Sequence, residues 1–280
     1  PIYGSDAIAG VVNIITKHRQ DGLQASAQIG EFGQGDGFGQ DYNFSWGVSN
    51  DHSRVVLGGG YFRQDPVYAG DRDISRYPSP YATSCLEGGC SSGTPLGRFI
   101  VHDPNTGSDL DVTLKGALPP GVTPNYDPLD PTGPGSSFRD FTTGDRFNFQ
   151  PFNYIEIPSE RISMFGQVTQ DLTDNVHLRV RGSYVNRTSA NQAAPLPLFV
   201  GPDAGNGNLL DTVSVDATNI YNPFGFNLGP GTYSFIGRRL VEGGPRHYAQ
   251  DVNTQNFTAS LDGQFGLGGR RLRLQAIERA

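Results

Sequence analysis

The chain opens with Pro1-Ile-Tyr-Gly-Ser-Asp-Ala-Ile-Ala-Gly-Val-Val-Asn-Ile-Ile-Thr-Lys17. The first part of this stretch predicts a turn, because Gly4 tolerates unusual dihedral angles and the side chains of Ser5 and Asp6 can hydrogen-bond to nearby backbone amides. A run of mostly small residues follows and permits close packing. The β-branched run that comes next, interrupted only by Asn13, indicates a buried strand. By composition alone, such a strand could belong to any all-β or α/β protein.

The order of these residues resembles the closing segment of the plug domain in TonB-dependent outer-membrane receptors. Turn residues, small residues and an Asn within the apolar run follow one another as they do in that family. The positions that carry the resemblance are Tyr3, Gly4, Ser5, Asp6, Ala7, Gly10 and Asn13. In these receptors the chain then enters a large β-barrel. The resemblance therefore implies that residues 1–17 end a plug domain and that residues 18–280 form the N-terminal part of the barrel.

Beyond residue 17, alternating apolar and polar side chains predict strands whose two faces meet different surroundings. Such alternation covers residues 23–30, 41–48, 55–61, 162–169, 176–184 and 256–265, and another strand begins at residue 271. Short turns at residues 49–52, 171–175 and 266–269 join these strands in pairs. In bacterial membrane barrels short turns lie on the periplasmic side and long loops lie outside. We therefore predict an all-β, antiparallel transmembrane β-barrel, of which this chain contains about six to seven strands.

Two long connections, at about residues 64–158 and 187–245, show no persistent strand pattern and are rich in Pro, Gly, Asp and Ser. Connections of this length are unusual inside a compact soluble domain, but they are typical of the outer loops of a membrane barrel. The strand count also assigns Thr232–Leu240 to the second outer loop. In receptors of the resembled family such loops contact the ligand, so both loops are candidates for ligand binding.

One face of the strand at residues 176–184 carries charged side chains that cannot point into hydrocarbon. We expect it to face water or a polar lumen, and we expect the same of one acidic residue in the strand at 256–265. The lumen-facing candidates are His177, Arg179, Arg181 and Asp262. Four aromatic residues near strand ends or on apolar faces are candidates for a membrane-interface girdle. These are Tyr42, Trp46, Tyr61 and Tyr184.

The two cysteines, Cys85 and Cys90, lie five positions apart in a Gly-rich loop. This spacing favours a local disulfide, which requires an oxidising compartment such as the periplasm or the cell surface. Two free thiols, or half of a zinc site, are the alternatives. The sequence contains no second Cys pair or His cluster to complete such a site.

The sequence also excludes several classes of function. A net charge of −7 argues against a nucleic-acid-binding protein, which would carry a basic patch. The five histidines are scattered, and no nucleophile or phosphate-binding motif occurs, so we predict neither an enzyme nor a cofactor. The loop Asp103–Asp111 places oxygen-bearing side chains at alternate positions, as calcium loops do. It also matches a plain hairpin turn, which we favour.

The resemblance implies ligand-gated, energy-coupled import of a scarce nutrient, such as a siderophore, saccharide or peptide, across the outer membrane of a Gram-negative bacterium. Its partners would be membrane lipid, the nutrient and the TonB energy-coupling protein, which would bind a region outside this sequence. A secreted all-β glycan-binding protein and a passive porin are the main alternatives, and an outer-membrane barrel enzyme is a third. We expect the chain alone to aggregate, because a partial barrel leaves backbone groups unpaired at both sheet edges.

Overall fold

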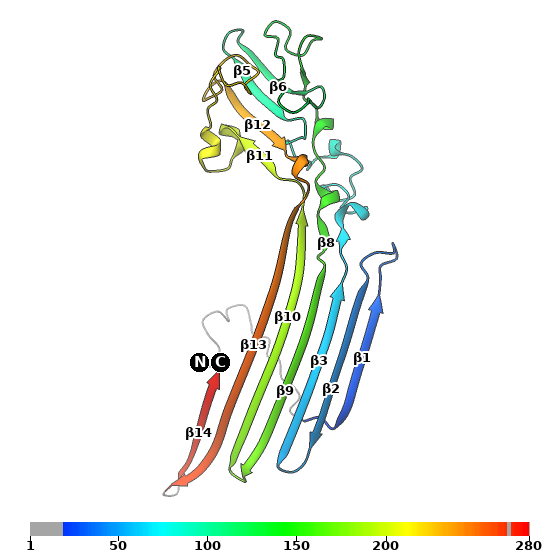
Figure 1. Ribbon diagram of the computed structural model, residues 1–280, viewed down its shortest axis with the longest axis vertical. Coiled ribbons are helices and arrows are strands. Elements are labelled where there is room, and N and C mark those ends of the chain that lie inside the picture. The colour runs from blue at the N-terminus through cyan, green and yellow to red at the C-terminus, as the bar shows by residue number, and fades with distance from the viewer. Residues whose placement is uncertain (1–18, 268–269, 280) are drawn as a thin grey trace. The chain divides into compact units, whose positions relative to one another are not determined.

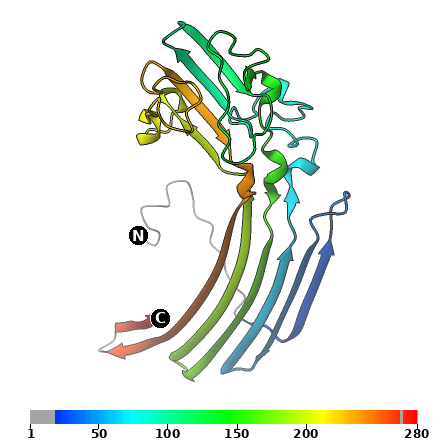
Figure 2. The same ribbon diagram turned by 45° about the horizontal axis from the view of Figure 1, so that its top comes forward.

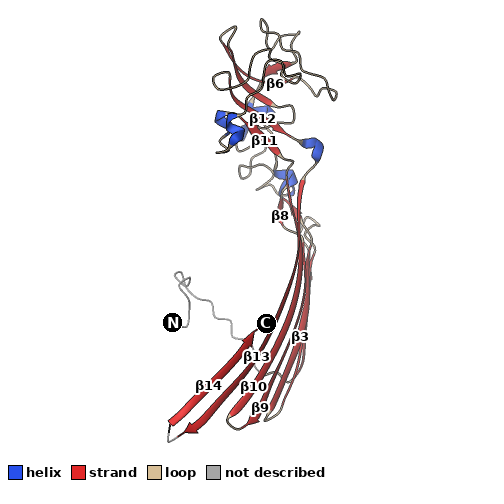
Figure 3. Ribbon diagram, turned by 60° about the vertical axis from the view of Figure 1, so that its left-hand side comes forward, coloured by secondary structure: helices blue, strands red, loops and turns tan. Residues whose placement is uncertain are grey.

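The computed structural model describes residues 19–267 and 270–279, with side chains described up to residue 263. The plug-like positions predicted within residues 1–17 lie outside the described residues. The protein is all-β, with 49% of the described residues in strands and 9% in helical turns, and its sheets are antiparallel (Figure 1). Every helix that the structure describes is a 3₁₀ turn of three or four residues (Figure 3). No helix among the described residues has the length and hydrophobicity to cross a membrane.

The chain divides into two compact units. Unit 1 comprises residues 1–65, 158–189 and 249–280, and unit 2 comprises residues 66–157 and 190–248. Unit 1 contains a curved seven-stranded sheet in the order β1-β2-β3-β9-β10-β13-β14 (Figure 2). Its strands are β1 (Gly22–Gly30), β2 (Gly39–Ser49), β3 (Ser53–Gln64), β9 (Ser159–Thr173), β10 (Val176–Ala193), β13 (Arg246–Leu267) and β14 (Arg270–Arg279). This sheet confirms the predicted number and pairing of strands, but it is open and does not close into a barrel.

Local side-chain chemistry fixes the short turns and the register of this sheet. In the β2–β3 turn, the side-chain oxygen of Asn50 accepts hydrogen bonds from the backbone N–H groups of His52 and Ser53. Within β3, a Cβ atom at Gly58 would lie 2.5 Å from the ring of Phe165 on β9. The glycine therefore leaves space for a large aromatic side chain on the neighbouring strand.

Unit 2 contains a five-stranded sheet in the order β11-β12-β5-β6-β7 and a separate two-stranded sheet of β4 and β8. Its strands are β4 (Val67–Tyr68), β5 (Arg98–Asp103), β6 (Ser108–Leu114), β7 (Phe138–Asp140), β8 (Tyr154–Glu156), β11 (Pro197–Val200) and β12 (Tyr233–Arg239). Its 3₁₀ turns are η1 (Ala69–Asp71), η2 (Cys85–Glu87), η3 (Thr143–Asp145), η4 (Gln150–Phe152), η5 (Pro202–Ala204), η6 (Leu209–Thr212) and η7 (Val241–Gly243).

The bounds of unit 2 nearly coincide with the two long connections predicted at residues 64–158 and 187–245. Although no persistent strand pattern marks these connections in the sequence, they contain short strands. The two connections fold together around a buried cluster of aromatic and aliphatic side chains. The cluster comprises Val101, Val112, Phe138, Phe224, Phe226, Leu228 and Tyr233. Segment Thr232–Leu240 contains β12, which pairs with β5 and β11 and is not a strand of the seven-stranded sheet, as predicted.

Candidate functional site

One face of the seven-stranded sheet is a band of exposed apolar side chains, which we call the apolar face. The register of β2, β3, β9 and β10 aligns four rows of residues on it. The rows are Val48–Val55–Val168–Val180, Trp46–Leu57–Gly166–Gly182, Phe44–Gly59–Met164–Tyr184 and Tyr42–Tyr61–Ile162–Asn186. Large side chains in the middle rows are about half exposed, with Phe44 at 53% and Met164 at 59%. No described element covers this face of the sheet, which would be unfavourable in water.

Polar residues bound the apolar face at both ends of the strands. On β9, Glu160 faces Arg63 just beyond the row of Ile162, and Gln170 faces Ser53 at the opposite end. Glu160 and Gln170 lie ten residues apart, which corresponds to about 33 Å along an extended strand. At the strand tilt of about 40° that is typical of membrane barrels, this length projects to about 25 Å. At that tilt, the band would have the height of the apolar belt of outer-membrane barrels.

Aromatic residues lie at one border of this band. The rings of Tyr42 and Tyr61 are stacked across neighbouring strands, with centroids 6.4 Å apart. The hydroxyl of Tyr184 donates a hydrogen bond of 2.8 Å to the side-chain oxygen of Asn253. Trp46 lies in an inner row, so it is on the apolar face but not at its border. Tyr184 pairs with Met164, so it also lies in an inner row. Tyr42 and Tyr61 thus occupy the border row, where the aromatic residues of a membrane-interface girdle are expected.

The opposite face of the sheet is mostly polar and holds the charged residues predicted from the sequence. Arg179 and Arg181 lie opposite Thr169 and Gln167 on β9 and alternate with the valines of the apolar face. His177 Nδ1, at the start of β10, lies 2.5 Å from Asp171 Oδ1. Asp262 follows the exposed apolar Leu261 on β13, so its side chain points to the other side of that strand.

A hollow of about 460 Å³ opens on this polar face. Its polar lining residues are Gln20, Gln24, Ser45, Ser163, Gln167, Arg181 and Ser183. Gln20, which precedes β1, is 9% exposed, and its side-chain amide donates a 2.9 Å hydrogen bond to the backbone oxygen of Ser45. A Cβ atom at Gly47 would lie 2.4 Å from the backbone oxygen of Gln20. The segment before β1 therefore crosses the polar face over a glycine.

Sequence reasoning missed Gln20 and Gly47, because Gln20 precedes the first alternating segment and Gly47 does not interrupt the alternation. The amide, hydroxyl and guanidinium groups of the hollow can hydrogen-bond a polar solute or another chain segment. The described residues hold no group of three or more metal-ligating side chains.

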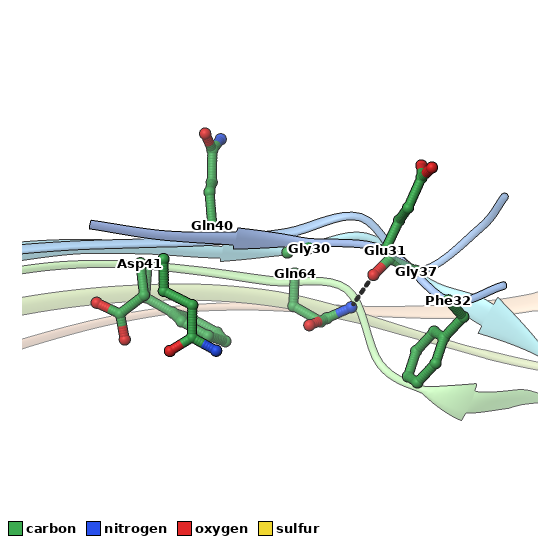
Figure 4. A pocket seen from close by; sticks show the side chains of 10 residues that line it. Gly30, Glu31, Phe32, Gly37, Gln40, Asp41 and Gln64 are labelled. Carbon is green, nitrogen blue, oxygen red and sulfur yellow. Dashed lines mark hydrogen bonds between the residues drawn. The ribbon is translucent and has the colours of Figure 1, made fainter.

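A second hollow, of about 310 Å³, lies near the β1–β2 connection (Figure 4). The side-chain amide of Gln64 donates a 2.9 Å hydrogen bond to the backbone oxygen of Gly37. Figure 4 shows Gln40 and Asp41, which are consecutive in β2, pointing to opposite sides of the sheet. The two-faced character of the sheet thus extends to this end of the strands.

In unit 2, Cys85 and Cys90 are joined by a disulfide, with their Cα atoms 5.4 Å apart. The enclosed loop is fixed further by Glu87, whose carboxylate accepts hydrogen bonds from the backbone N–H groups of Thr83 at 2.8 Å and Ser84 at 3.1 Å. The bonds from Thr83 hold the pKa of the Glu87 carboxyl below its usual range. The loop is therefore held both by the disulfide and by the hydrogen bonds of Glu87.

The loop Asp103–Asp111 is the hairpin between β5 and β6, and its carboxylates do not converge. Asp103 is fully buried and accepts a 2.7 Å hydrogen bond from the Tyr126 hydroxyl. Burial raises the pKa of Asp103, but the hydrogen bonds from Tyr126 and the backbone outweigh it, so the pKa lies below its usual value. Asp109 contacts His102, and the third carboxylate pairs with Arg98. Each carboxylate has its own partner, as in a structural hairpin.

No protein-family model and no solved structure matches this chain. Two features of the chain itself bear on its function. One is the difference between the apolar and the polar face of the seven-stranded sheet, and the other is the resemblance of the sequence of residues 1–17 to a plug segment.

Proposed function

We propose that this chain contains the end of the plug and the first barrel strands of a TonB-dependent receptor in the outer membrane of a Gram-negative bacterium. The observation that carries the proposal is the apolar face, bounded by polar rows about 25 Å apart when projected at a typical strand tilt. In water, an exposed apolar surface of this kind is an association site. In a bilayer, lipid chains cover it, while the polar face turns to the barrel interior.

The connections between strands support the same proposal. Within unit 1, β2–β3 and β9–β10 are joined by turns of a few residues, whereas β3–β9 and β10–β13 are joined by the two segments that form unit 2. This alternation of short and long connections is the pattern of bacterial membrane barrels. The edge strands of the sheet, β1 and β14, leave backbone groups that further strands would pair in a closed barrel.

In this proposal the protein imports a scarce nutrient, such as a siderophore, saccharide or peptide, by energy-coupled gating of the plug. Outer-membrane lipid, the nutrient and the TonB protein are its partners. No bond is made or broken, because the protein acts by binding and conformational change. The two long connections that make up unit 2 are the candidate ligand-binding segments in this proposal.

The single tryptophan of the sequence offers a direct test of the membrane proposal. Trp46 is 41% exposed on the apolar face, level with Gly166 on β9 and so about 10 Å from the polar row at Gln170. With the protein as its gene encodes it in phospholipid vesicles, we expect bromine atoms deep in the acyl chains to quench Trp46 fluorescence more strongly than shallow ones.

The matched control is the double variant Ser45→Trp/Trp46→Phe, which moves the indole to the polar face. Its fluorescence should be insensitive to brominated lipid. Equal quenching of both proteins by a water-soluble quencher, with no effect of brominated lipid on either, would refute the membrane proposal. Uptake that continues after the proton-motive force is dissipated would favour a passive porin.

A further inference from the structure

Two arginines of unit 2 are anchored on consecutive peptide carbonyls. Arg239, the last residue of β12, donates from Nη1 to the backbone oxygen of Pro195 at 2.8 Å. Arg246 donates from Nε to the backbone oxygen of Ala194, also at 2.8 Å. Burial lowers the pKa of the Arg239 guanidinium, and the nearby charge of Arg246 lowers it further. The two positive charges thus lie within electrostatic reach of each other.

Neither charge is neutralised by the protein. Within the described part of the chain, no carboxylate lies within 4.0 Å of Arg239 or Arg246. Arg239 is only 4% exposed, and its Nε has no hydrogen-bond partner among the described residues. Its guanidinium carbon lies 5.0 Å from the centre of the Phe147 ring, which supplies only a cation–π contact. A buried guanidinium without a counter-charge is unfavourable.

Other arginines of the same unit are paired differently. Three of them each contact a carboxylate: Arg98 pairs with Asp111, Arg139 with Asp145, and Arg238 with Glu242. Arg238 is the immediate neighbour of Arg239 on β12, yet its side chain is 43% exposed and its charge is compensated. Arg146 also lacks a carboxylate partner among the described residues and donates to the backbone oxygen of Cys90, but it is not among the buried residues. Arg239 is therefore distinguished by being both buried and uncompensated.

We propose that Arg239 and Arg246 bind an oxyanion, either a phosphate or a carboxylate group. Arg239 Nε and the two terminal nitrogens of Arg246 have no acceptor among the described residues. Guanidinium groups present parallel N–H donors that match the paired oxygens of these anions. The Phe147 ring limits access of water on one side of Arg239, which strengthens an ionic hydrogen bond there. The site does not depend on whether unit 1 lies in a membrane.

Calorimetric titration of the protein as its gene encodes it, in detergent at fixed ionic strength, tests this site. The probes are inorganic phosphate, acetate and a short-chain soluble phosphatidic acid. We expect saturable binding of at least one probe, and at least a tenfold loss of affinity in Arg246→Gln, because a charge-assisted hydrogen bond contributes about that much. Binding of the phospholipid alone assigns a lipid headgroup, binding of inorganic phosphate assigns a free phosphate, and binding of acetate alone assigns a carboxylate.

The control variant is Arg238→Gln, which removes a charge one residue away and should leave the affinity unchanged. Arg239→Gln should behave as Arg246→Gln does. If Arg239→Gln fails to fold, the half-buried Arg246 still decides the result. Absence of binding by all three probes, or an equal loss of affinity in Arg238→Gln and Arg246→Gln, would overturn the proposal. Membrane quenching of Trp46 is unaffected by either outcome, so the two proposals can fail separately.

Discussion

Substitution of Met164 by arginine places a charge near the centre of the apolar face. On β9, Met164 is four residues from Glu160 and six from Gln170, or about 10 Å and 15 Å from the two polar rows after projection. An arginine at the midplane of a membrane barrel destabilises it by about 2–4 kcal/mol. We therefore expect Met164→Arg to lower the folded-to-unfolded ratio by about 30- to 1,000-fold in a denaturant titration in vesicles, with the protein as its gene encodes it.

Ser163 provides a matched control, because it precedes Met164 on the same strand and faces the polar side. Ser163→Arg should change the free energy of unfolding by less than 1 kcal/mol, since its side chain stays among polar groups. Val168→Arg should give an intermediate loss, because Val168 lies in the last apolar row before Gln170. Equal effects of Ser163→Arg and Met164→Arg would contradict a membrane-facing apolar side and would favour a sheet with water on both faces.

Three further changes test unit 2, each by denaturant unfolding. Replacing Cys85 and Cys90 by serine should lower the free energy of unfolding of unit 2 by about 2 kcal/mol, which is the entropy contribution expected from closing so short a loop. An unchanged free energy of unfolding would show that the loop is ordered without the disulfide. Asn222→Ala should lower the free energy of unfolding by about 2–4 kcal/mol, because the side-chain amide, which is 8% exposed, hydrogen-bonds two buried backbone groups. A decrease below about 0.5 kcal/mol would contradict that role. The bond from Arg139 lowers the pKa of Asp145 to about 2. The ionised Asp145 should stabilise unit 2 by about 1–2 kcal/mol after solvent screening, fully above about pH 5 and not at all as the pH falls toward 2. Asp145→Asn should remove this pH dependence of the free energy of unfolding.

The seven strands of unit 1 could be predicted because apolar and polar residues alternate along each of them in the sequence. The prediction was least accurate for strand length. β10 extends to Ala193 and β13 begins at Arg246, so both are longer than the alternating segments at residues 176–184 and 256–265. Beyond Tyr184, the residues of β10 are mostly polar on both faces. Outside the apolar band no difference between the faces remains, so the period-two signal ends before the strand does.

The fold of unit 2 could not be predicted, because its core is assembled from residues far apart in the sequence. Phe138 stacks on Phe224 with ring centroids 5.3 Å apart, although 85 residues separate them. Three of its strands, β4, β7 and β8, have only two or three residues, which is too short to show a period. The arginine pair was equally hidden, because Arg239 and Arg246 become distinctive only through the carboxylates that are not beside them. Local pattern predicts strands, but it does not reveal long-range packing or missing counter-charges.

The exposure of β1 connects the open sheet to the membrane proposal. Every residue of β1, Gly22–Gly30, is exposed, although the strand is paired with β2 along its whole length. A strand with neither face buried and one free edge gains little from folding in water. In a bilayer the balance changes, because the apolar Leu23 and Ile29 contact lipid and each unpaired backbone group at the free edge costs several kcal/mol. In the proposed barrel, this cost would favour closure of the sheet, and β1 and β14 are the strands that would receive the next partners.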